Sequence, residues 1–360
     1  MKKKASVAVV IVNYNTSELL INLLDSLWLM KTDTNYSVII IDNDSSIGDI
    51  KTLKKYFLSK CNHTRSGSLE VAEFKLKISC YERESNKNKI YFIKSSSNGG
   101  FASGCNIGAS VAVSLKEFEY IWFLNPDTYV DSYSLESIML KFSSNKNYSA
   151  VGCRIIDYYN HNVLGVCGGG SYCKIFGLPI NISDKTLVND EKIIEDRLLY
   201  LHGASMMIKT EMIIKYSGFC ESYFHYFEEL DFFSRFNSFE LLGYASNSFV
   251  YHVGAASSSS VASSTDKKGY LSEFSEYYMF KNRILFCRYH YPNMLMFVLV
   301  GILYALIKRL LLGRFISAKT ILRAMQDSIE KLPSKKTLFF DIYAELSWHK
   351  AKKVTKSLTR

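Results

Sequence analysis

The run Val7-Ala-Val-Val-Ile-Val12, followed at once by Asn13-Tyr14-Asn15, decides the fold of this chain. A short apolar run rich in β-branched residues and closed by a polar turn is typical of a strand buried on both faces. Leucines then recur at helical spacing between positions 19 and 27. Three lysines precede the run, but it is too short for a signal peptide and lacks a small-residue cleavage site. We therefore interpret residues 7–12 as the first strand of a parallel sheet.

The same unit of strand, polar turn and helix returns three times in the next 120 residues. The further strands are expected at 38–41, 90–93 and 120–124, and each ends in a polar or glycine-rich turn. Such alternation predicts an α/β fold, in which a Rossmann-like, mainly parallel sheet carries helices on both faces. Ligands of such sheets bind at the carboxyl ends of the strands. The polar stretch 59–89 interrupts the rhythm, and we interpret it as an inserted hairpin.

Composition and charge narrow the class of protein and its partners. The chain has 360 residues, of which 48% are hydrophobic, and this excludes a disordered protein. The net charge of +10 is concentrated near the two ends and at Lys308-Arg309. This distribution favours an anionic membrane surface and argues against nucleic acid, which requires a basic stripe. Eight cysteines without a CxxC motif indicate reduced thiols in a cytosolic protein.

The second half of the chain is less regular. We expect a glycine-rich turn at 168–170, a strand at 199–208, a helix that opens near Tyr226, and a loop over the Ser/Ala-rich run 255–264. Residues 294–307 are uncharged and almost all apolar, which favours a re-entrant or interfacial helix at a membrane. A buried helix of a C-terminal bundle is the alternative. Further helical patterns cover 315–332 and 337–350. The expected units are residues 1–130, residues 131–290 and a helical, membrane-associating appendage (291–360).

Motifs that are weak singly form a specific series in chain order. Asn-Pro-Asp is also an ordinary turn, and Asn98-Gly-Gly-Phe101 does not spell the GxGxxG of dinucleotide folds or a P-loop. The series begins with the polar turns that follow the four expected strands. It continues with Leu201-His-Gly-Ala204, Gly218-Phe219, Glu228-Glu-Leu-Asp231 and His252-Val-Gly254. Over about residues 5–290 it resembles the family 2 glycosyltransferases of the GT-A fold, particularly the bacterial rhamnosyltransferase-like branch.

The resemblance implies a donor site and a metal site. Tyr14, beside Asn13, is similar to the residue that stacks on the nucleobase, and Asp42 and Asn43 match the turn that reads the base edge and ribose. The loop of Asn98, Gly99, Gly100 and Phe101 is similar to the one that lies along the nucleotide. Asn125-Pro126-Asp127 stands where the family has an Asp-x-Asp motif, without the first carboxylate. Asp127, with His252, is therefore the expected ligand set for Mg²⁺ or Mn²⁺.

The resemblance also implies a general base, because inverting transfer requires one group to take the acceptor's proton. The family uses the Asp of a Glu-Asp pair, and Glu229 occupies that position here, with Glu228 as its competitor. Asp231 on the same element is expected to orient it or to cap the helix terminus. His202 would border the acceptor pocket or serve as a core histidine. Arg283 would meet a diphosphate or the phosphate of a lipid-linked acceptor, or lie on a helix surface.

These expectations combine into one function. The chain is expected to be an inverting, metal-dependent glycosyltransferase that moves a sugar to a lipid-linked bacterial surface polysaccharide. The first candidate for that sugar is L-rhamnose, from dTDP-rhamnose. It would work in the cytoplasm, peripherally bound to the inner face of the cell membrane. A UDP-hexose, UDP-hexosamine or galactofuranose donor is the alternative within the class. A non-catalytic binding protein on the same fold and a nucleotidyltransferase are the alternatives outside it. The oligomeric state stays open.

Overall fold

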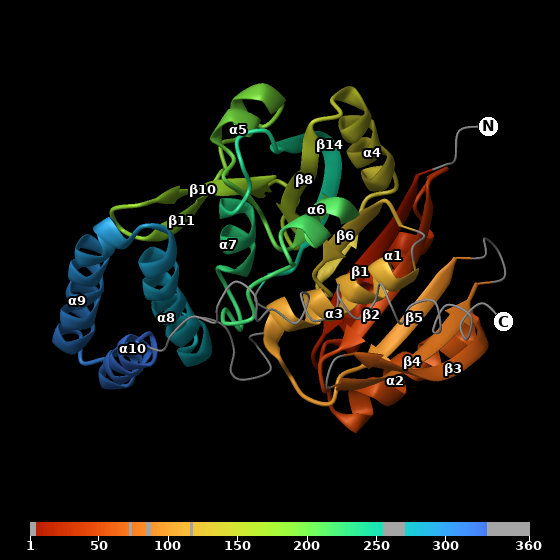
Figure 1. Ribbon diagram of the computed structural model, residues 1–360, viewed down its shortest axis with the longest axis horizontal. Coiled ribbons are helices and arrows are strands. Elements are labelled where there is room, and N and C mark those ends of the chain that lie inside the picture. Colours follow the sequence, from red (N-terminus) through yellow and green to blue (C-terminus); the bar gives the residue numbers. More distant parts are fainter. Residues whose placement is uncertain (1–4, 72–73, 84–87, 116–117, 255–270, 330–360) are drawn as a thin grey trace.

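The computed structural model describes residues 5–71, 74–83, 88–115, 118–254 and 271–329 (Figure 1). A mixed sheet forms the centre of this part of the chain. Its four inner strands run parallel in the order β5-β2-β1-β6. They are β1 (Ser6–Asn13), β2 (Asn35–Asp42), β5 (Lys89–Lys94) and β6 (Tyr120–Leu124). These are the four strands that the sequence predicts, so the α/β expectation is confirmed.

Strand β1 shows why the sheet has a core on each face. Alternate residues of a strand point to opposite faces. Val7, Val9 and Ile11 join the core beneath α1 (Ser17–Trp28), α2 (Ile47–Lys60) and α4 (Ser134–Ser144). The intervening apolar residues join the core beneath α3 (Gly100–Leu115) and α6 (Thr210–Lys215). Complete burial of each branched side chain contributes roughly 1.5–3 kcal/mol, which fixes the strand at the centre of the domain.

The second half of the chain returns into the same sheet. Strand β13 (Ser205–Lys209) lies antiparallel between β6 and β8 (Tyr148–Asp157), and β14 (Leu241–His252) follows β8. At its end, β14 pairs with the short β7 (Thr128–Val130), and β9 (Leu164–Cys167) pairs with β8. The expected halves 1–130 and 131–290 therefore share one sheet.

Two local predictions in this half are wrong. The strand predicted at 199–208 is divided by a turn at 202–204 into β12 (Tyr200–Leu201) and β13, because the backbone N–H of Ser205 bonds back to the carbonyl of His202. The glycine-rich turn at 168–170 is mostly strand, since β10 (Gly169–Cys173) begins within it. Strand β10 forms a small separate sheet with β11 (Leu178–Asn181) and β12.

The insertion predicted at 59–89 is a hairpin. Strands β3 (Asn62–Val71) and β4 (Phe74–Glu82) pair antiparallel, and β4 extends the main sheet beyond β5. The hairpin makes the sheet mixed without disturbing its parallel centre.

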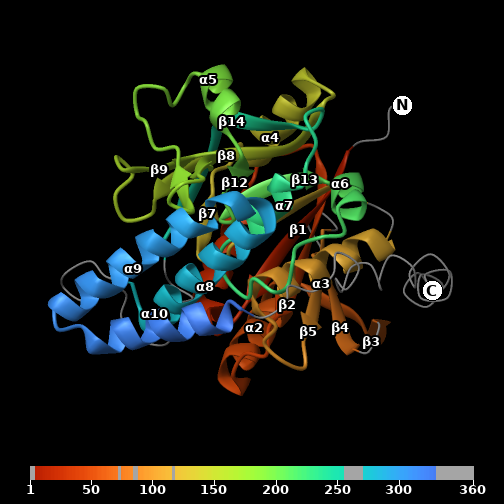
Figure 2. The same cartoon turned by 60° about the vertical axis from the view of Figure 1, so that its left-hand side comes forward.

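Three helices form the C-terminal part of the described chain: α8 (Glu273–His290), α9 (Leu295–Leu311, after the turn Pro292–Met294) and α10 (Phe315–Asp327). They share an apolar cluster, and Leu285 and Phe286 of α8 also join the core beneath α3. Figure 1 shows α8 and α9 beside the β10–β11 hairpin, and Figure 2 shows the three helices from another side. The pattern predicted at 315–332 corresponds to α10, whereas 337–350 and the run 255–264 lie outside the described residues.

Helix α9 contains the apolar stripe of the sequence. The stretch Pro292–Leu311 has a mean hydropathy of 2.1, and by length and composition it is the one described helix able to cross a membrane. Only Val298, Ile302 and Leu306 are buried within it. One face of α9 therefore packs on its neighbours, and the rest of this apolar helix is exposed.

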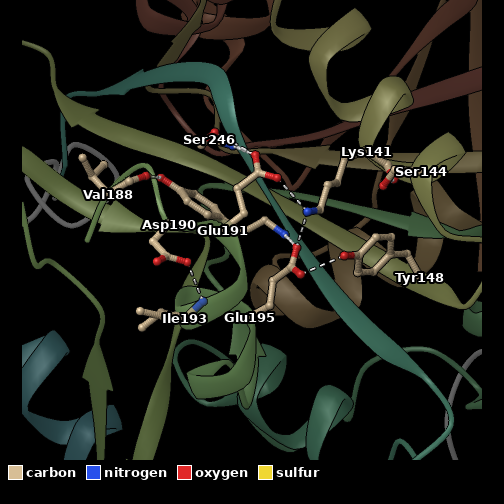
Figure 3. Close-up of polar contacts among 10 residues, drawn as sticks. Lys141, Ser144, Tyr148, Val188, Asp190, Glu191, Ile193, Glu195 and Ser246 are labelled. Atoms are coloured by element: carbon tan, nitrogen blue, oxygen red, sulfur yellow. Dashed lines mark hydrogen bonds and ion pairs between the residues drawn. The ribbon is translucent and has the colours of Figure 1, made fainter. Parts of the chain in front are cut away.

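A polar network attaches α5 (Glu191–Arg197) to the main sheet (Figure 3). Lys141 of α4 contacts both Glu191 and Glu195 at 2.7 Å. Glu195 accepts from the Tyr148 hydroxyl, and Glu191 accepts from the backbone and hydroxyl of Ser246. Burial works against the charge of Glu191, but the bonds from Lys141 and Ser246 outweigh it and lower its pKa. The lysine thus neutralises two partly buried carboxylates.

Replacing Lys141 with Met should destabilise the protein by about 3 kcal/mol, because it leaves two carboxylates without their cation in a poorly hydrated place. Chemical denaturation at neutral pH measures this loss. Lys215→Met is the matched control, since Lys215 is half exposed in its ion pair with Glu240 and the change should cost under about 1 kcal/mol. Equal losses in the two variants would contradict the role assigned to the network.

Candidate active site

The turns after β1 and β2 are joined by a dense set of hydrogen bonds. The Asn13 amide donates to Asp42, Ser45 and Asp49, and Thr16 donates to the Asn13 oxygen. Asn13 and Asp42 are fully buried, and burial raises the Asp42 pKa despite the bonds from Ser45 and Asn13. These two expected donor-site residues therefore lie in the buried hydrogen-bond network that joins the turns after β1 and β2. Tyr14, between them in the chain, is partly exposed.

The loop 98–101 lies against the turn after β2. The Asn43 amide donates to the Asn98 side chain at 2.9 Å and to the Gly100 carbonyl at 3.0 Å. The backbone N–H of Phe101 donates to the carbonyl of Phe224, at 2.9 Å. Gly100 has φ +85°, and a Cβ there would stand 2.2 Å from that oxygen, so only glycine fits. The structure thus brings together Asn43, Asn98, Gly99, Gly100 and Phe101, as the sequence predicts.

A strained turn precedes the acidic helix. Tyr226 and Phe227 both have positive φ, 69° and 74°, which costs of order 1–3 kcal/mol per non-glycine residue. The buried Asn282 side chain on α8 donates to the carbonyls of His225 and Tyr226, at 2.8 and 2.9 Å. The turn ends at α7 (Glu228–Ser234). This strained backbone therefore sets the direction in which the side chains of the two glutamates point.

The two glutamates have unusual environments. Glu228 is 3% exposed, and one carboxylate oxygen of each glutamate is buried without a hydrogen-bond partner among the described residues. Burial, and for Glu228 also the neighbouring Glu229, raises the pKa of both; that of Glu229 is raised to about 7. Oε1 of Glu229 faces Gly203, and a Cβ added there would lie 3.4 Å from it and 3.8 Å from the Phe101 ring. Gly203 of the 202–204 turn therefore lies close to both the Glu229 carboxylate and the Phe101 ring.

Asp231 has a different task. It contacts His290 at 2.8 Å and Arg235 at 3.2 Å, and it is almost completely buried. Both carboxylate oxygens of Asp231 are engaged, which supports the expectation that Asp231 orients the helix. In this respect Asp231 differs from the two glutamates.

The register of β7 and β14 assembles the expected metal ligands. His252 pairs with Thr128, and the Val253 N–H donates to the Asp127 carbonyl, at 3.0 Å. Nε2 of His252 consequently lies 3.3 Å from Oδ1 of Asp127. The described residues contain no group of three or more His, Cys, Asp or Glu side chains that could hold a metal by themselves. One carboxylate and one imidazole suit an ion whose other ligands come from substrate phosphate oxygens.

His202 stands beside this pair, with its ring centroid 6.1 Å from that of His252. Its Nδ1 accepts from the Ala204 N–H, at 3.1 Å, which assigns the proton to Nε2. Burial and the neighbouring His252 lower the pKa of His202 to about 3, so the ring is neutral. Asn125 belongs to the same edge, since its N–H donates to the Ala204 carbonyl.

Arg283 is the expected site residue that the structure sets apart. It lies between Gly177, in the turn of the β10–β11 hairpin, and Gly301 on α9. No contact joins it to the loops after β1, β2, β5 or β6 in the described part of the chain.

The sequence did not single out three residues that position the site. Asn282 holds the strained turn, Phe224 supplies the carbonyl for Phe101, and Asn106 on α3 bonds the backbone of Phe219 in both directions at 2.8 Å. Phe219 belongs to the motif series, so one partner of this pair was visible in the sequence. Nothing in the sequence indicated the strain at residues 226–227.

Glu228→Gln should stabilise the protein increasingly as the pH rises. The folded Glu228 has a raised pKa, so above about pH 4.5 it holds a proton that the unfolded chain releases, and the wild type loses up to about 1.4 kcal/mol per pH unit. Glutamine removes this loss. Denaturation at about pH 5 and about pH 8 should show a larger gain at the higher pH. The exposed Glu211→Gln is the control, and a gain independent of pH would contradict the assignment.

Comparison with known proteins concerns the family and the fold of the chain. Residues 8–166, a little under half of the chain, match the family model "Glycosyl transferase family 2". No curated protein matches the chain. A solved structure of GalNAc-T7 with UDP, GalNAc and Mn²⁺ superposes with a TM-score of 0.57 at 13% identity, over 99% of this chain and 58% of that one.

Two further solved structures are similar at lower scores. TarS 1–349 of S. aureus in complex with UDP-GlcNAc has a TM-score of 0.49 at 14% identity, over 96% of this chain and 87% of that one. The mannosyltransferase PcManGT of Pyrobaculum calidifontis, with GDP-Man and Mn²⁺, has a TM-score of 0.45 at 10% identity, over 98% and 88%. The fold is GT-A-like with a C-terminal helical part, and the family match over residues 8–166 supports a glycosyltransferase.

Proposed function

We propose that this protein is an inverting glycosyltransferase that moves a sugar from a nucleotide sugar to an acceptor hydroxyl. The observation that carries the proposal is the position of Glu229, which has a pKa raised to about 7, one buried carboxylate oxygen, and the other oxygen beside Gly203, which the Phe101 ring also approaches. The first candidate donor is dTDP-L-rhamnose, from the resemblance to the rhamnosyltransferase-like branch. A UDP-hexose, UDP-hexosamine or galactofuranose donor is the alternative.

Glu229 is suited to the proton transfer. A general base works best when its pKa lies near the operating pH, and burial gives Glu229 such a value. Its unpartnered oxygen can accept the acceptor's proton while that hydroxyl oxygen bonds to the anomeric carbon and the nucleoside diphosphate leaves. Glu228 is nearly completely buried, and the neighbouring Glu229 adds to the burial that raises the pKa of Glu228.

Asp127 and His252 would hold a Mg²⁺ or Mn²⁺ ion. The distance of 3.3 Å between their polar atoms lets both side chains face one ion. Such an ion would neutralise the departing diphosphate, so no separate acid is required. The solved structure of GalNAc-T7, which shares the fold, contains Mn²⁺ with UDP.

We further propose a lipid-linked glycan acceptor and a peripheral position on the inner face of the cell membrane. Support comes from α9, where Phe297, Val300 and Tyr304 are among the exposed apolar residues and the last turn carries the exposed Lys308. Apolar insertion and attraction of cations to anionic lipid together hold a protein at a bilayer where either alone is marginal.

Glu229→Gln should reduce sugar transfer by roughly 10²–10⁴-fold, the usual contribution of a general base. Nucleoside diphosphate release from a panel of nucleotide sugars, with acceptor present, measures the rate and identifies the donor. The wild-type rate should rise as the pH passes through about 7, because the carboxyl with the raised pKa must lose its proton to act.

Glu211→Gln is the matched control and should transfer at the wild-type rate, because Glu211 is exposed on α6. Activity in Glu229→Gln and its loss in Glu228→Gln would show that Glu228 is the base. No release from any nucleotide sugar would overturn the proposed function.

Asp127→Asn should weaken nucleotide-sugar binding only when Mg²⁺ or Mn²⁺ is present. The amide keeps the size of the side chain but removes the charge that binds the cation, and such contacts are among the strongest in a phosphate site. Calorimetry with metal and with chelator separates the two conditions. Equal binding by wild type and variant in the presence of metal would contradict the assignment of Asp127.

A further inference from the structure

Among the described residues, Arg283 is a buried cation to which no carboxylate is paired. The residue is 6% exposed, and its Nε has no hydrogen-bond partner in the described part of the chain. The titratable groups around it are Tyr172, Cys173 and Cys287, none of which is ordinarily charged. An unpaired charge in such a place is costly unless a partner compensates it. A buried guanidinium retained without a carboxylate indicates that the partner is a ligand.

The structure leaves space for this guanidinium by means of two glycines. A Cβ at Gly301 of α9 would lie 2.9 Å from a terminal nitrogen of Arg283, and one at Gly177 would lie 3.2 Å from its Cγ. A second polar group nearby also lacks a partner, since the buried Tyr172 hydroxyl on β10 has no hydrogen bond among the described residues. A guanidinium and a hydroxyl together are suited to phosphate oxygens.

The surfaces on both sides of Arg283 are apolar and exposed. The hairpin turn and β11 present Ile175, Phe176, Leu178 and Ile180, and α9 presents Phe297, Val300 and Tyr304. Figure 1 shows this hairpin beside α8 and α9, and Gly177 directly neighbours Val298 of α9. Lys174, placed over the Tyr291 ring at 5.1 Å, adds a second cation on the hairpin. An anion that carries an apolar chain matches such a surface better than a free anion does.

We propose that Arg283, with the Tyr172 hydroxyl, binds the phosphate of a lipid-linked acceptor, whose apolar chain lies over the exposed faces of α9 and the β10–β11 hairpin. This inference rests on the proposed function, because it names the acceptor of the same enzyme. The donor diphosphate is the weaker candidate, since the neighbours of Arg283 include none of the residues of the donor loops or of the Asp127–His252 pair.

The geometry also connects this site with the base. Strand β10 carries Tyr172 and pairs with β12, whose last residue, Leu201, precedes the 202–204 turn that Glu229 faces. Arg283 follows Asn282, which holds the turn before α7. A phosphate at Arg283 would therefore be anchored by the elements that position the base.

Vesicle flotation with the full chain, without nucleotide sugar, tests the proposal. The probes are phosphatidylcholine vesicles alone, with a long-chain polyprenyl monophosphate, or with phosphatidylglycerol at equal charge. Wild type should bind the polyprenyl phosphate vesicles most tightly. Arg283→Met should bind them roughly 10-fold or more weakly, as expected when a charged group loses its hydrogen bonds, and should then no longer distinguish them from phosphatidylglycerol.

Two variants keep the test decisive. Arg323→Met removes the same charge from the exposed face of α10 and should bind like wild type. Tyr172→Phe deletes one oxygen, so it serves if Arg283→Met fails to fold, and it should weaken binding several-fold. Unchanged binding in both site variants, or equal binding of wild type to the two anionic vesicles, would overturn the proposal. Release by inorganic phosphate at the same concentration as polyprenyl phosphate would assign the site to free phosphate and would overturn it too.

The result is independent of the test of transfer. Loss of lipid-phosphate binding in Arg283→Met, with no diphosphate release from any nucleotide sugar, would support the phosphate site and contradict the proposed function. Release of nucleoside diphosphate from a nucleotide sugar, without lipid-phosphate binding that depends on Arg283, would support the proposed function and contradict the phosphate site.

Discussion

The hydrogen bond from the Phe101 N–H to the Phe224 carbonyl, 2.9 Å long, is the contact on which the arrangement of the site depends. It joins the loop after β5 to the segment that leads into α7. On one side, Asn43 holds the same loop through Asn98 and the Gly100 carbonyl. On the other side, Glu229 follows only five residues after Phe224. A movement of either segment would therefore change the separation between the donor loop and the base.

The strained turn at Tyr226 and Phe227 is maintained by interactions from outside its own segment. Asn282 of α8 bonds the turn's carbonyls, and His290, at the end of α8, contacts Asp231 of α7 at 2.8 Å. Helix α8 thus holds the start and the middle of α7 while its other face contributes to the apolar cluster with α9 and α10. Helix α8 is therefore part of the support of Glu229, and residues 271–290 belong to both units.

The sequence predicted the parts of this protein that follow from local pattern. Apolar runs and glycine-rich turns located β1, β2, β5 and β6, and with them the loops that bear Asn43, Asn98 and Asp127. It did not predict what arises from long-range pairing. The division of 199–208 depends on β12 joining a different sheet from β13, and the positive φ of Tyr226 depends on Asn282, 56 residues away. The burial of Asn13 and Asp42 likewise follows from hydrogen bonds between two loops, and such bonds cannot be read from a single sequence.

The insertion of β13 between β6 and β8 has a consequence for any attempt to divide the molecule. A fragment limited to the segment that matches the family model would contain β6 and β8 but not the strand between them. Both strands would then expose unpaired N–H and C=O groups along apolar edges such as Ile121–Leu124. Open, apolar strand edges recruit other chains and aggregate. The region that is recognisable by family is thus not a unit that can be isolated, and the later residues complete its sheet.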